Sequence, residues 1–281
     1  MNSKVIFFDA DGTIINGDFM SQETKKALRD LRSQGHILVL STGRALPALG
    51  KALKEMQFDN IISSGGNVIQ ADGEVIYNAH LSGEELIRIT DYLDELNIPY
   101  HMEAADYIWV KAGQKNNYLE RQKKVLSDKT SISKEQYEEE LRMQNDVKER
   151  TQEVYDLSTI KVNKIHYFHP TITVEHIRKK LGDNFRYTPL SLSNVFSGGE
   201  ISKLGVDKKV GMQKILEHFN QPLEPVIAVG DDYNDIEMLE YSPYSVVLDH
   251  APKEVKSYAD YITKSIENNG FSYAMKQLKL V

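Results

Sequence analysis

The chain contains no cysteine among its 281 residues. That absence excludes disulfide bridges, zinc sites built from thiolates and cysteine nucleophiles. Long apolar runs are missing as well. The first apolar run, Val5 to Phe8, is only four residues long and ends at a carboxylate, whereas a secretory signal or a membrane span needs many more apolar residues. Because no later run is long enough either, we expect a cytoplasmic protein that does not enter a membrane.

The sequence also lacks an excess of basic residues. Lys and Arg total 34 against 41 Asp and Glu, which gives a formal net charge of −7. Binding to a nucleic-acid backbone depends on neutralisation by Lys and Arg, so this balance argues against a nucleic-acid partner. The 41% hydrophobic and 27% charged contents are typical of a globular protein with one large domain or two smaller ones.

Short apolar runs alternate with helical periodicity near both ends of the chain. In the first part, the pattern predicts strands over 5–8, 36–40 and 60–62 and helices over 21–33 and 45–56. In the last part, it predicts helices over 207–219 and 235–240 and strands over 225–229 and 244–248. This alternation is typical of a parallel sheet with helices on both faces, so we predict an α/β fold with a Rossmann-like core.

The middle of the chain follows a different pattern. Residues 67–77 predict a hairpin around the Asp72-Gly73 turn. From residue 82 to 189, helix and strand signals are mixed, with a helix over 84–96 and strand candidates over 99–103, 107–110 and 161–168. We therefore predict that residues 1–81 and 190–281 form one core domain, and that residues 82–189 form a mixed α/β domain inserted into it.

Three polar clusters follow predicted core strands, at the edge where open parallel sheets bind ligands. The first holds Asp9 and Asp11, the second is Ser41-Thr42-Gly43-Arg44, and the third runs from Gly230 to Asp235. Paired carboxylates can share a divalent cation or divide nucleophilic and proton-transfer roles. A helix that begins after the second cluster would favour an anionic oxygen there. Three carboxylates in the third cluster favour a hard cation such as Mg²⁺.

Each cluster also has a plainer interpretation. The first pair is by itself an acidic turn, and an EF-hand loop is excluded because Gly12 comes too early and no Glu closes the loop. The second cluster is equally well an ordinary helix N-cap. The functional interpretation therefore depends on all three clusters occurring together and in this order.

Together the clusters resemble those of the haloacid dehalogenase superfamily of phosphohydrolases. The resemblance consists of the D-x-D-G-T box at 9–13, Thr42 at a strand end, and the G-D-D-x-N-D box at 230–235. With Thr42-Gly43-Arg44 and a large insertion after the third strand, the chain is most similar to the Cof-type sugar-phosphatase branch, subclass IIB. The resemblance covers the two core segments, and the middle matches only in position and size.

The resemblance implies a role for each motif residue. Asp9 would attack phosphorus and carry an aspartyl-phosphate, and Asp11 would protonate the leaving alcohol and then activate water. A Mg²⁺ cofactor would be held by Asp9, the backbone carbonyl of Asp11, Asp231 and Asp235. The phosphoryl group would be bound by Thr42, Gly43, Lys208 and Asn234.

Two positions depart from the pattern of the branch. The segment Gly205-Val206-Asp207-Lys208-Lys209 makes Lys208 the expected phosphate-binding lysine, but Lys209 stands where glycine is usual. Lys209 and Lys203 therefore stay open as alternatives. The segment Leu248-Asp249-His250-Ala251 stands where the branch has a Gly-Asn-Ala run. A local substrate contact is one interpretation of His250, but we expect a surface histidine there.

The resemblance makes the insertion a cap that recognises the leaving group. Residues that mix polar and aromatic character there are candidate lining residues, although ordinary packing or a surface position is the preferred interpretation of each: His101, Glu103, Tyr107, Trp109 and Arg121. We predict a Mg²⁺-dependent phosphoric monoester hydrolase that acts on a small phosphorylated metabolite, such as a sugar phosphate. The alternatives are a phosphomutase with the same core and a non-catalytic phosphometabolite-binding protein.

Overall fold

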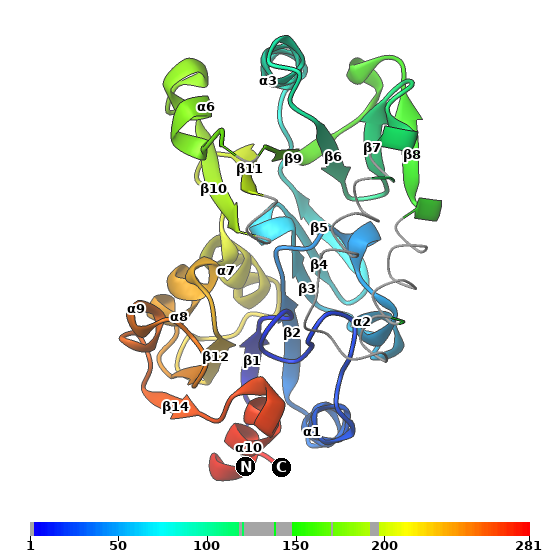
Figure 1. Ribbon diagram of the computed structural model, residues 1–281. Coiled ribbons are helices and arrows are strands. Elements are labelled where there is room, and N and C mark those ends of the chain that lie inside the picture. The colour runs from blue at the N-terminus through cyan, green and yellow to red at the C-terminus, as the bar shows by residue number, and fades with distance from the viewer. Residues whose placement is uncertain (1–2, 118–119, 121–137, 139–147, 170, 192–196) are drawn as a thin grey trace. The chain divides into compact units, whose positions relative to one another are not determined.

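The computed structural model describes residues 3–117, 120, 138, 148–169, 171–191 and 197–281 (Figure 1). The chain divides into two compact units. The core unit comprises residues 1–44, 50–77 and 207–281, and the insert unit comprises residues 45–49 and 78–206. Among the described helices, none combines the length and the apolar character needed to cross a membrane.

An eight-stranded sheet forms the centre of the core unit. Its strand order is β14-β13-β12-β1-β2-β3-β4-β5, and the first six of these strands pair in parallel. The strands are β1 (Val5–Phe8), β2 (Ile37–Ser41), β3 (Ile61–Ser63), β4 (Val68–Ala71), β5 (Glu74–Asn78), β12 (Val226–Gly230), β13 (Ser245–Leu248) and β14 (Tyr261–Thr263). The predicted α/β fold with a parallel sheet is confirmed. The pattern did not reveal β14, which follows the last strand that we predicted.

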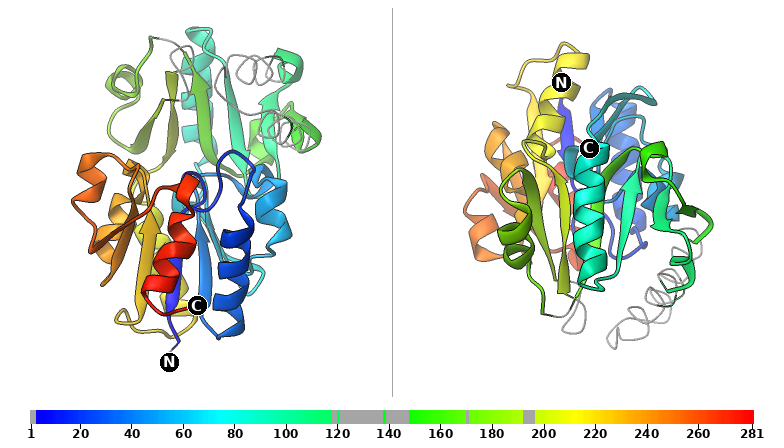
Figure 2. Two further views of the ribbon diagram at one scale, coloured as in Figure 1. Left: turned by 60° about the horizontal axis from the view of Figure 1, so that its bottom comes forward. Right: turned by 90° about the horizontal axis from the view of Figure 1, so that it is seen from above.

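Helices cover both faces of this sheet (Figure 2). Alternate side chains of β1 show why. Val5 and Phe7 pack with residues of α7, α8 and α9, whereas Phe8 meets Phe271 of α10 edge to face, with ring centroids 5.3 Å apart. A strand that is apolar on both sides needs two covering layers. The helices are α1 (Gln22–Ser33), α2 (Lys51–Glu55), α7 (Lys208–His218), α8 (Ile236–Tyr241), α9 (Lys253–Lys256) and α10 (Gly270–Gln277).

The helix predicted over 45–56 is wrong in its first half. The structure has a short 3₁₀ turn, η1 (Leu46–Ala48), and α2 begins only at Lys51. The buried Asp18 carboxylate explains the break, because it accepts hydrogen bonds from the backbone N–H groups of Lys51 (2.8 Å) and Ala52 (3.3 Å). A side chain at Gly50 would collide with that carboxylate. A distant Asp thus caps α2 from outside the helix.

The turn between β4 and β5 matches the predicted hairpin position. Asp72 and Gly73 both have positive φ values, 50° and 82°. Two consecutive left-handed residues are what a two-residue type I′ turn requires, and Asp-Gly is one of its preferred pairs.

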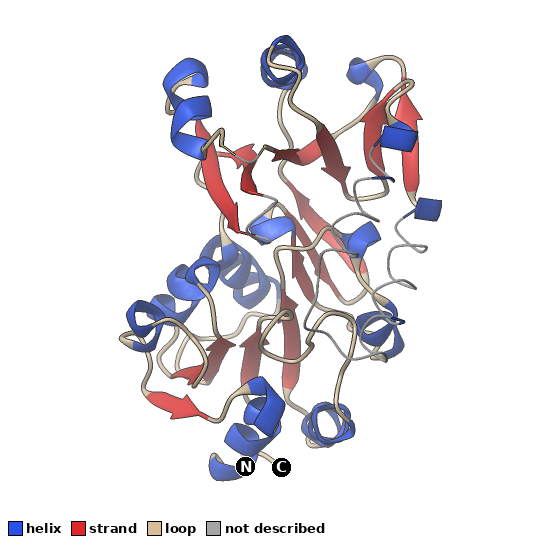
Figure 3. Ribbon diagram, viewed as in Figure 1, coloured by secondary structure: helices blue, strands red, loops and turns tan. Residues whose placement is uncertain are grey.

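A six-stranded sheet with the order β10-β11-β9-β6-β7-β8 forms the insert unit (Figure 3). All its neighbouring strands pair antiparallel except β7 and β8, which are parallel. The strands are β6 (Tyr100–Ala104), β7 (Ile108–Lys111), β8 (Thr151–Val154), β9 (Val162–Phe168), β10 (Phe185–Ser191) and β11 (Ser197–Lys203). The described helices are α3 (Gly83–Glu95), which begins with a capping box formed by Ser82 and Glu85, and α6 (Val174–Leu181).

The two faces of the insert sheet differ in chemistry. On one face, Met102, Ile165 and Ile201 pack with the apolar sides of α3 and α6. On the other face, the alternate residues of the same three central strands are charged or titratable: His101, Glu103, Lys164, His166 and Glu200. Since successive side chains of a strand point to opposite faces, one layer of helices leaves this polar row on the opposite side.

The boundaries of the insert unit differ from the predicted ones. We assigned residues 190–281 to the core, but the predicted break after Pro189 falls inside β10, and β11 pairs with β10 in the insert sheet. The insert unit extends to Val206. Its start lies at Asn78 instead of Ser82, and residues 45–49 are added to it. Long-range strand pairing sets these limits, and a local pattern does not report it.

Candidate active site

Three carboxylates meet where β1 and β12 end. Asp9 directly follows β1, and Asp231 and Asp235 follow β12. The two strands are parallel neighbours, with Phe8 opposite Val229, so both loops leave the sheet at the same edge. One oxygen of each carboxylate lies within 4.8 Å of the others, and all three residues are buried. Sheet topology therefore joins two clusters that are more than 200 residues apart in the sequence.

The buried Lys208 connects two of these carboxylates. Its Nζ donates to Oδ1 of Asp9 at 2.5 Å and to Oδ1 of Asp235 at 2.6 Å. Lys208 is the first residue of α7, and only 2% of it is exposed to solvent. The alternatives that the sequence left open lie elsewhere: Lys209 is exposed over the ring of Tyr241, and Lys203 pairs with Glu85 of the insert unit.

Short loops hold the acidic residues in place. Asp235 Oδ2 accepts hydrogen bonds from the backbone N–H groups of Asp231 (3.0 Å) and Asp232 (3.1 Å). The Thr13 hydroxyl donates to Asp231 Oδ1 at 2.6 Å. Gly12 has φ +83°, and a side chain there would lie 2.1 Å from Asp231 Oδ2. The glycine and the threonine of the first box thus position an acid of the third.

Burial and mutual repulsion oppose the charge on these acids. Burial raises the pKa of Asp9 well above its usual value, Lys208 opposes that rise, and Asp235, Asp231 and Asp11 add to it. The pKa of Asp231 is also raised, mainly by burial, although hydrogen bonds from His250 and Thr13 oppose the rise. The pKa of Lys208 is raised because, against burial, Asp235 and Asp9 stabilise its charge. The site therefore favours additional positive charge.

Thr42 and Gly43 lie at the end of β2, next to this group in the sheet order. The buried Thr42 hydroxyl accepts a hydrogen bond from the Arg44 backbone N–H at 3.1 Å. A Cβ built on Gly43 would lie 3.7 Å from Nδ2 of Asn234, so these two phosphate-binding candidates are neighbours. Asn234 Oδ1 is buried and has no hydrogen-bond partner among the described residues. The expected helix N-terminus after Arg44 is absent, because α2 begins only at Lys51.

Asp11 does not belong to the group of three buried acids. Arg44 binds it with a two-pronged ion pair, in which Nε donates to Oδ2 at 2.8 Å and Nη2 to Oδ1 at 2.6 Å. Nη2 also donates to the carbonyl oxygen of Gly17. About half of the Asp11 side chain, 49%, is exposed. Arg44 belongs to the second polar cluster of the sequence, but only the folded chain shows that Asp11 is its partner.

His250 is exposed, as expected, and it also contacts the acidic group. Its Nε2 lies 3.2 Å from Oδ2 of Asp231, and its side chain is 32% exposed. The hydrogen bond with Asp231 raises the pKa of His250. The departure from the Gly-Asn-Ala run was the signal in the sequence. Of the cap candidates, Arg121 lies outside the described residues.

Comparison with known proteins defines the family. The model of the haloacid dehalogenase-like hydrolases matches residues 6–275, so the chain belongs to this family. YkrA of Bacillus subtilis (strain 168), named as a candidate phosphatase, is 27% identical over 100% of both chains. YitU of the same organism, a 5-amino-6-(5-phospho-D-ribitylamino)uracil phosphatase, is 25% identical over 97% of this chain and 96% of its own.

A solved structure gives the same result for the fold. The subclass IIB sugar phosphatase BT4131 superposes with a TM-score of 0.76 at 24% identity, over 99% of this chain and 100% of its own. The predicted family and the predicted enzyme class, a phosphatase of the haloacid dehalogenase type, are confirmed.

Proposed function

We propose that this protein is a Mg²⁺-dependent phosphatase that hydrolyses a small phosphorylated metabolite, with Asp9 as the nucleophile. The observation that carries the proposal is the placement of the Asp9 carboxylate. It lies at the end of a core strand, with Asp231 and Asp235 beside it and Lys208 in hydrogen-bond contact. A nucleophilic carboxylate needs neighbouring cations, because phosphoryl transfer spreads negative charge over the equatorial oxygens.

The donor set fits magnesium. Lys208 contacts only two of the three buried carboxylates, and burial and repulsion raise the pKa values of Asp9 and Asp231, so a divalent ion would relieve an existing imbalance. All three donors are oxygens, which Mg²⁺ prefers over nitrogen or sulfur ligands. Asp9, Asp231 and Asp235, with the Asp11 carbonyl, would hold the ion. When bound, it supplies positive charge that orients and neutralises the phosphoryl group.

The residues of the chain divide the chemistry between them. An Asp9 oxygen attacks phosphorus, and the bond from phosphorus to the leaving oxygen breaks. Asp11 donates a proton to that oxygen, so the product leaves as an alcohol and Asp9 carries the phosphoryl group. Asp11 then accepts a proton from water, whose oxygen attacks phosphorus and releases Asp9. Thr42, Gly43, Asn234 and Lys208 hold the phosphoryl oxygens during both steps.

The relatives support a substrate class. BT4131 is named a sugar phosphatase, and YitU acts on a phosphoribityl compound. In both, a phosphate is attached to a small polyhydroxylated carbon chain. We extend that class to this protein and take sugar phosphates as the first substrates to screen, with the insert unit as the part that distinguishes among them.

Asp11→Asn tests the proton-transfer role. A phenolate leaves without a proton, whereas an alkoxide does not, so the variant is expected to lose far more kcat on a sugar phosphate than on p-nitrophenyl phosphate. General acid catalysis contributes roughly 10²–10⁴-fold, which sets the expected loss on the sugar phosphate. The exposed Asp249→Asn serves as the control with unchanged kinetics. Equal losses on both substrates would show that Asp11 does not protonate the leaving group.

Removal and replacement of the metal test the cofactor. Turnover is expected to stop after treatment with a chelator and to return on addition of Mg²⁺, measured as phosphate release. Ca²⁺ is expected to support turnover poorly, because it takes more ligands at longer distances and can bind both oxygens of the attacking carboxylate. Full turnover in the chelated enzyme would contradict a metal role at Asp9, Asp231 and Asp235.

A further inference from the structure

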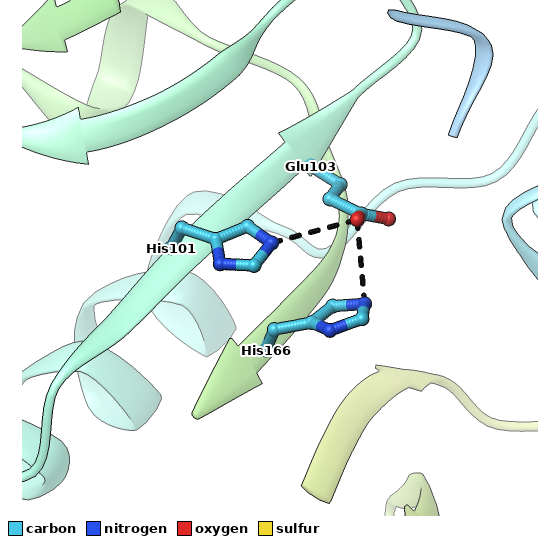
Figure 4. A group of neighbouring side chains, drawn as sticks. All are labelled: His101, Glu103 and His166. Carbon is cyan, nitrogen blue, oxygen red and sulfur yellow. Dashed lines mark ion pairs between the residues drawn. The ribbon is translucent and has the colours of Figure 1, made fainter. Parts of the chain in front are cut away.

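A second group of metal-ligating side chains lies wholly within the insert unit, on the polar face of its sheet. Figure 4 shows His101 and Glu103 of β6 and His166 of β9 directed toward one another. One ligand atom from each lies within 4.8 Å of the others. Strand register explains the grouping, because His101 is paired with His166, and Glu103 is two residues further along the same face.

The two distances from the carboxylate to the imidazoles match a small tetrahedral cation. Glu103 Oε1 lies 3.5 Å from His101 Nε2 and 3.3 Å from His166 Nε2. For a zinc ion with bonds of about 2.0–2.1 Å, tetrahedral geometry places neighbouring ligand atoms about 3.3–3.4 Å apart. The rings of His101 and His166 are stacked with centroids 4.7 Å apart, so they would have to turn for both nitrogens to face one ion, a side-chain rotation that does not require the strands to move.

The neighbouring lysine approaches the other oxygen of Glu103, not the one that faces the two histidines. Lys164 Nζ approaches the other oxygen of Glu103, Oε2, at 3.5 Å and donates to Glu200 Oε1 at 2.8 Å. Glu200 Oε1 also lies 2.9 Å from His166 Nε2. Because this is the same nitrogen that faces Glu103, a metal bound there would replace the ion pair between His166 and Glu200.

The geometry points to a second metal site in this protein, in which His101, Glu103 and His166 bind Zn²⁺ or a similar transition-metal ion. Two imidazoles and one carboxylate select such ions over Mg²⁺, whose preferred ligands are all oxygens. The side chains of His166 and Glu200 are 15% and 18% exposed, which provides an entry side for the ion. The site is chemically distinct from the carboxylates of the core unit, and its test does not depend on turnover.

Metal binding to the full-length protein tests the site. The wild type is dialysed against Zn²⁺ in the presence of excess Mg²⁺, and bound zinc is counted by mass spectrometry. We expect one zinc per chain in the wild type, and we expect His101→Ala and Glu103→Gln to lose it. His176→Ala, in the exposed part of α6, and Asp231→Asn, in the core unit, should both retain it.

Cobalt spectroscopy provides a second readout that needs no variant. Co²⁺ bound by two imidazoles and one carboxylate in a tetrahedral site gives intense visible absorption bands, which Zn²⁺ then abolishes by displacement. Absence of these bands together with absence of saturable zinc binding in the wild type would overturn the proposal. Retention of zinc by folded His101→Ala and Glu103→Gln, checked by melting temperature, would overturn it as well. In either case the five side chains would be a charge-balanced ion network without a metal.

Discussion

Asp9→Asn is expected to abolish turnover on every phosphorylated substrate while the fold is preserved. The change keeps the size and shape of the side chain and removes the charge that attacks phosphorus. Loss of a nucleophile that works with its neighbours as a unit lowers kcat by roughly 10⁴-fold or more. The measurement is phosphate release in the presence of Mg²⁺, with the melting temperature recorded to show that the protein folds.

Asp232→Asn provides the matched control for this experiment. Asp232 belongs to the same acidic box as Asp231 and Asp235, but it is exposed and its carboxylate is not part of the buried group. Its side chain accepts a hydrogen bond from the Tyr233 backbone, which an asparagine oxygen can also accept. We expect near-normal kcat for this variant. Substantial turnover by Asp9→Asn would mean that another group attacks phosphorus.

Lys208→Met is expected to reduce both stability and turnover. Methionine fills the space of the lysine stem but leaves Asp9 and Asp235 without the cation that contacts both. Removal of one partner from a buried ion pair costs about 3–5 kcal/mol of unfolding free energy, because the remaining charge stays uncompensated. Loss of a positive group that stabilises the transition state lowers kcat by roughly 10²–10³-fold.

Lys209→Met is the control in the adjacent position, where the side chain is exposed over an aromatic ring and touches no acid of the site. It should change unfolding free energy by no more than about 1 kcal/mol. Unfolding in denaturant with and without Mg²⁺ gives a further comparison. If the ion binds the same acids, Mg²⁺ should stabilise Lys208→Met more than the wild type. A result in which Lys209→Met is the damaging change would reverse the assignment of the two lysines.

Local pattern was sufficient where short-range physics decides the structure. The apolar run at 5–8 requires cover on both sides, and the structure provides helices on both faces of the core sheet. Asp72-Gly73 has few alternatives to a tight turn, and both residues adopt positive φ. The three polar boxes follow strands because a run of polar residues ends an apolar strand, whatever the rest of the chain does.

Tertiary structure decided which distant residues meet. The sequence places Asp9 and Asp231 at two strand ends, but only the strand order makes those strands neighbours. Lys208 and Lys209 carry identical side chains. Their positions at the start of α7 bury Lys208 and leave Lys209 exposed. Asp18, 33 residues away in the sequence, caps the N-terminus of α2 at Lys51. The helix therefore begins later than the pattern from residue 45 predicts.

Long-range strand pairing also explains the corrected boundary of the insert unit and the cluster of His101, Glu103 and His166. A domain limit depends on which strands pair, and β10 pairs with β11 across the position where the sequence pattern changes. His101 and His166 are 65 residues apart, and each alone is an ordinary strand residue. Their pairing in register places two imidazoles and the Glu103 carboxylate on one face. The sequence by itself determined which chemical groups the chain carries and where strands end, whereas the long-range pairing of strands decided which of those groups act together.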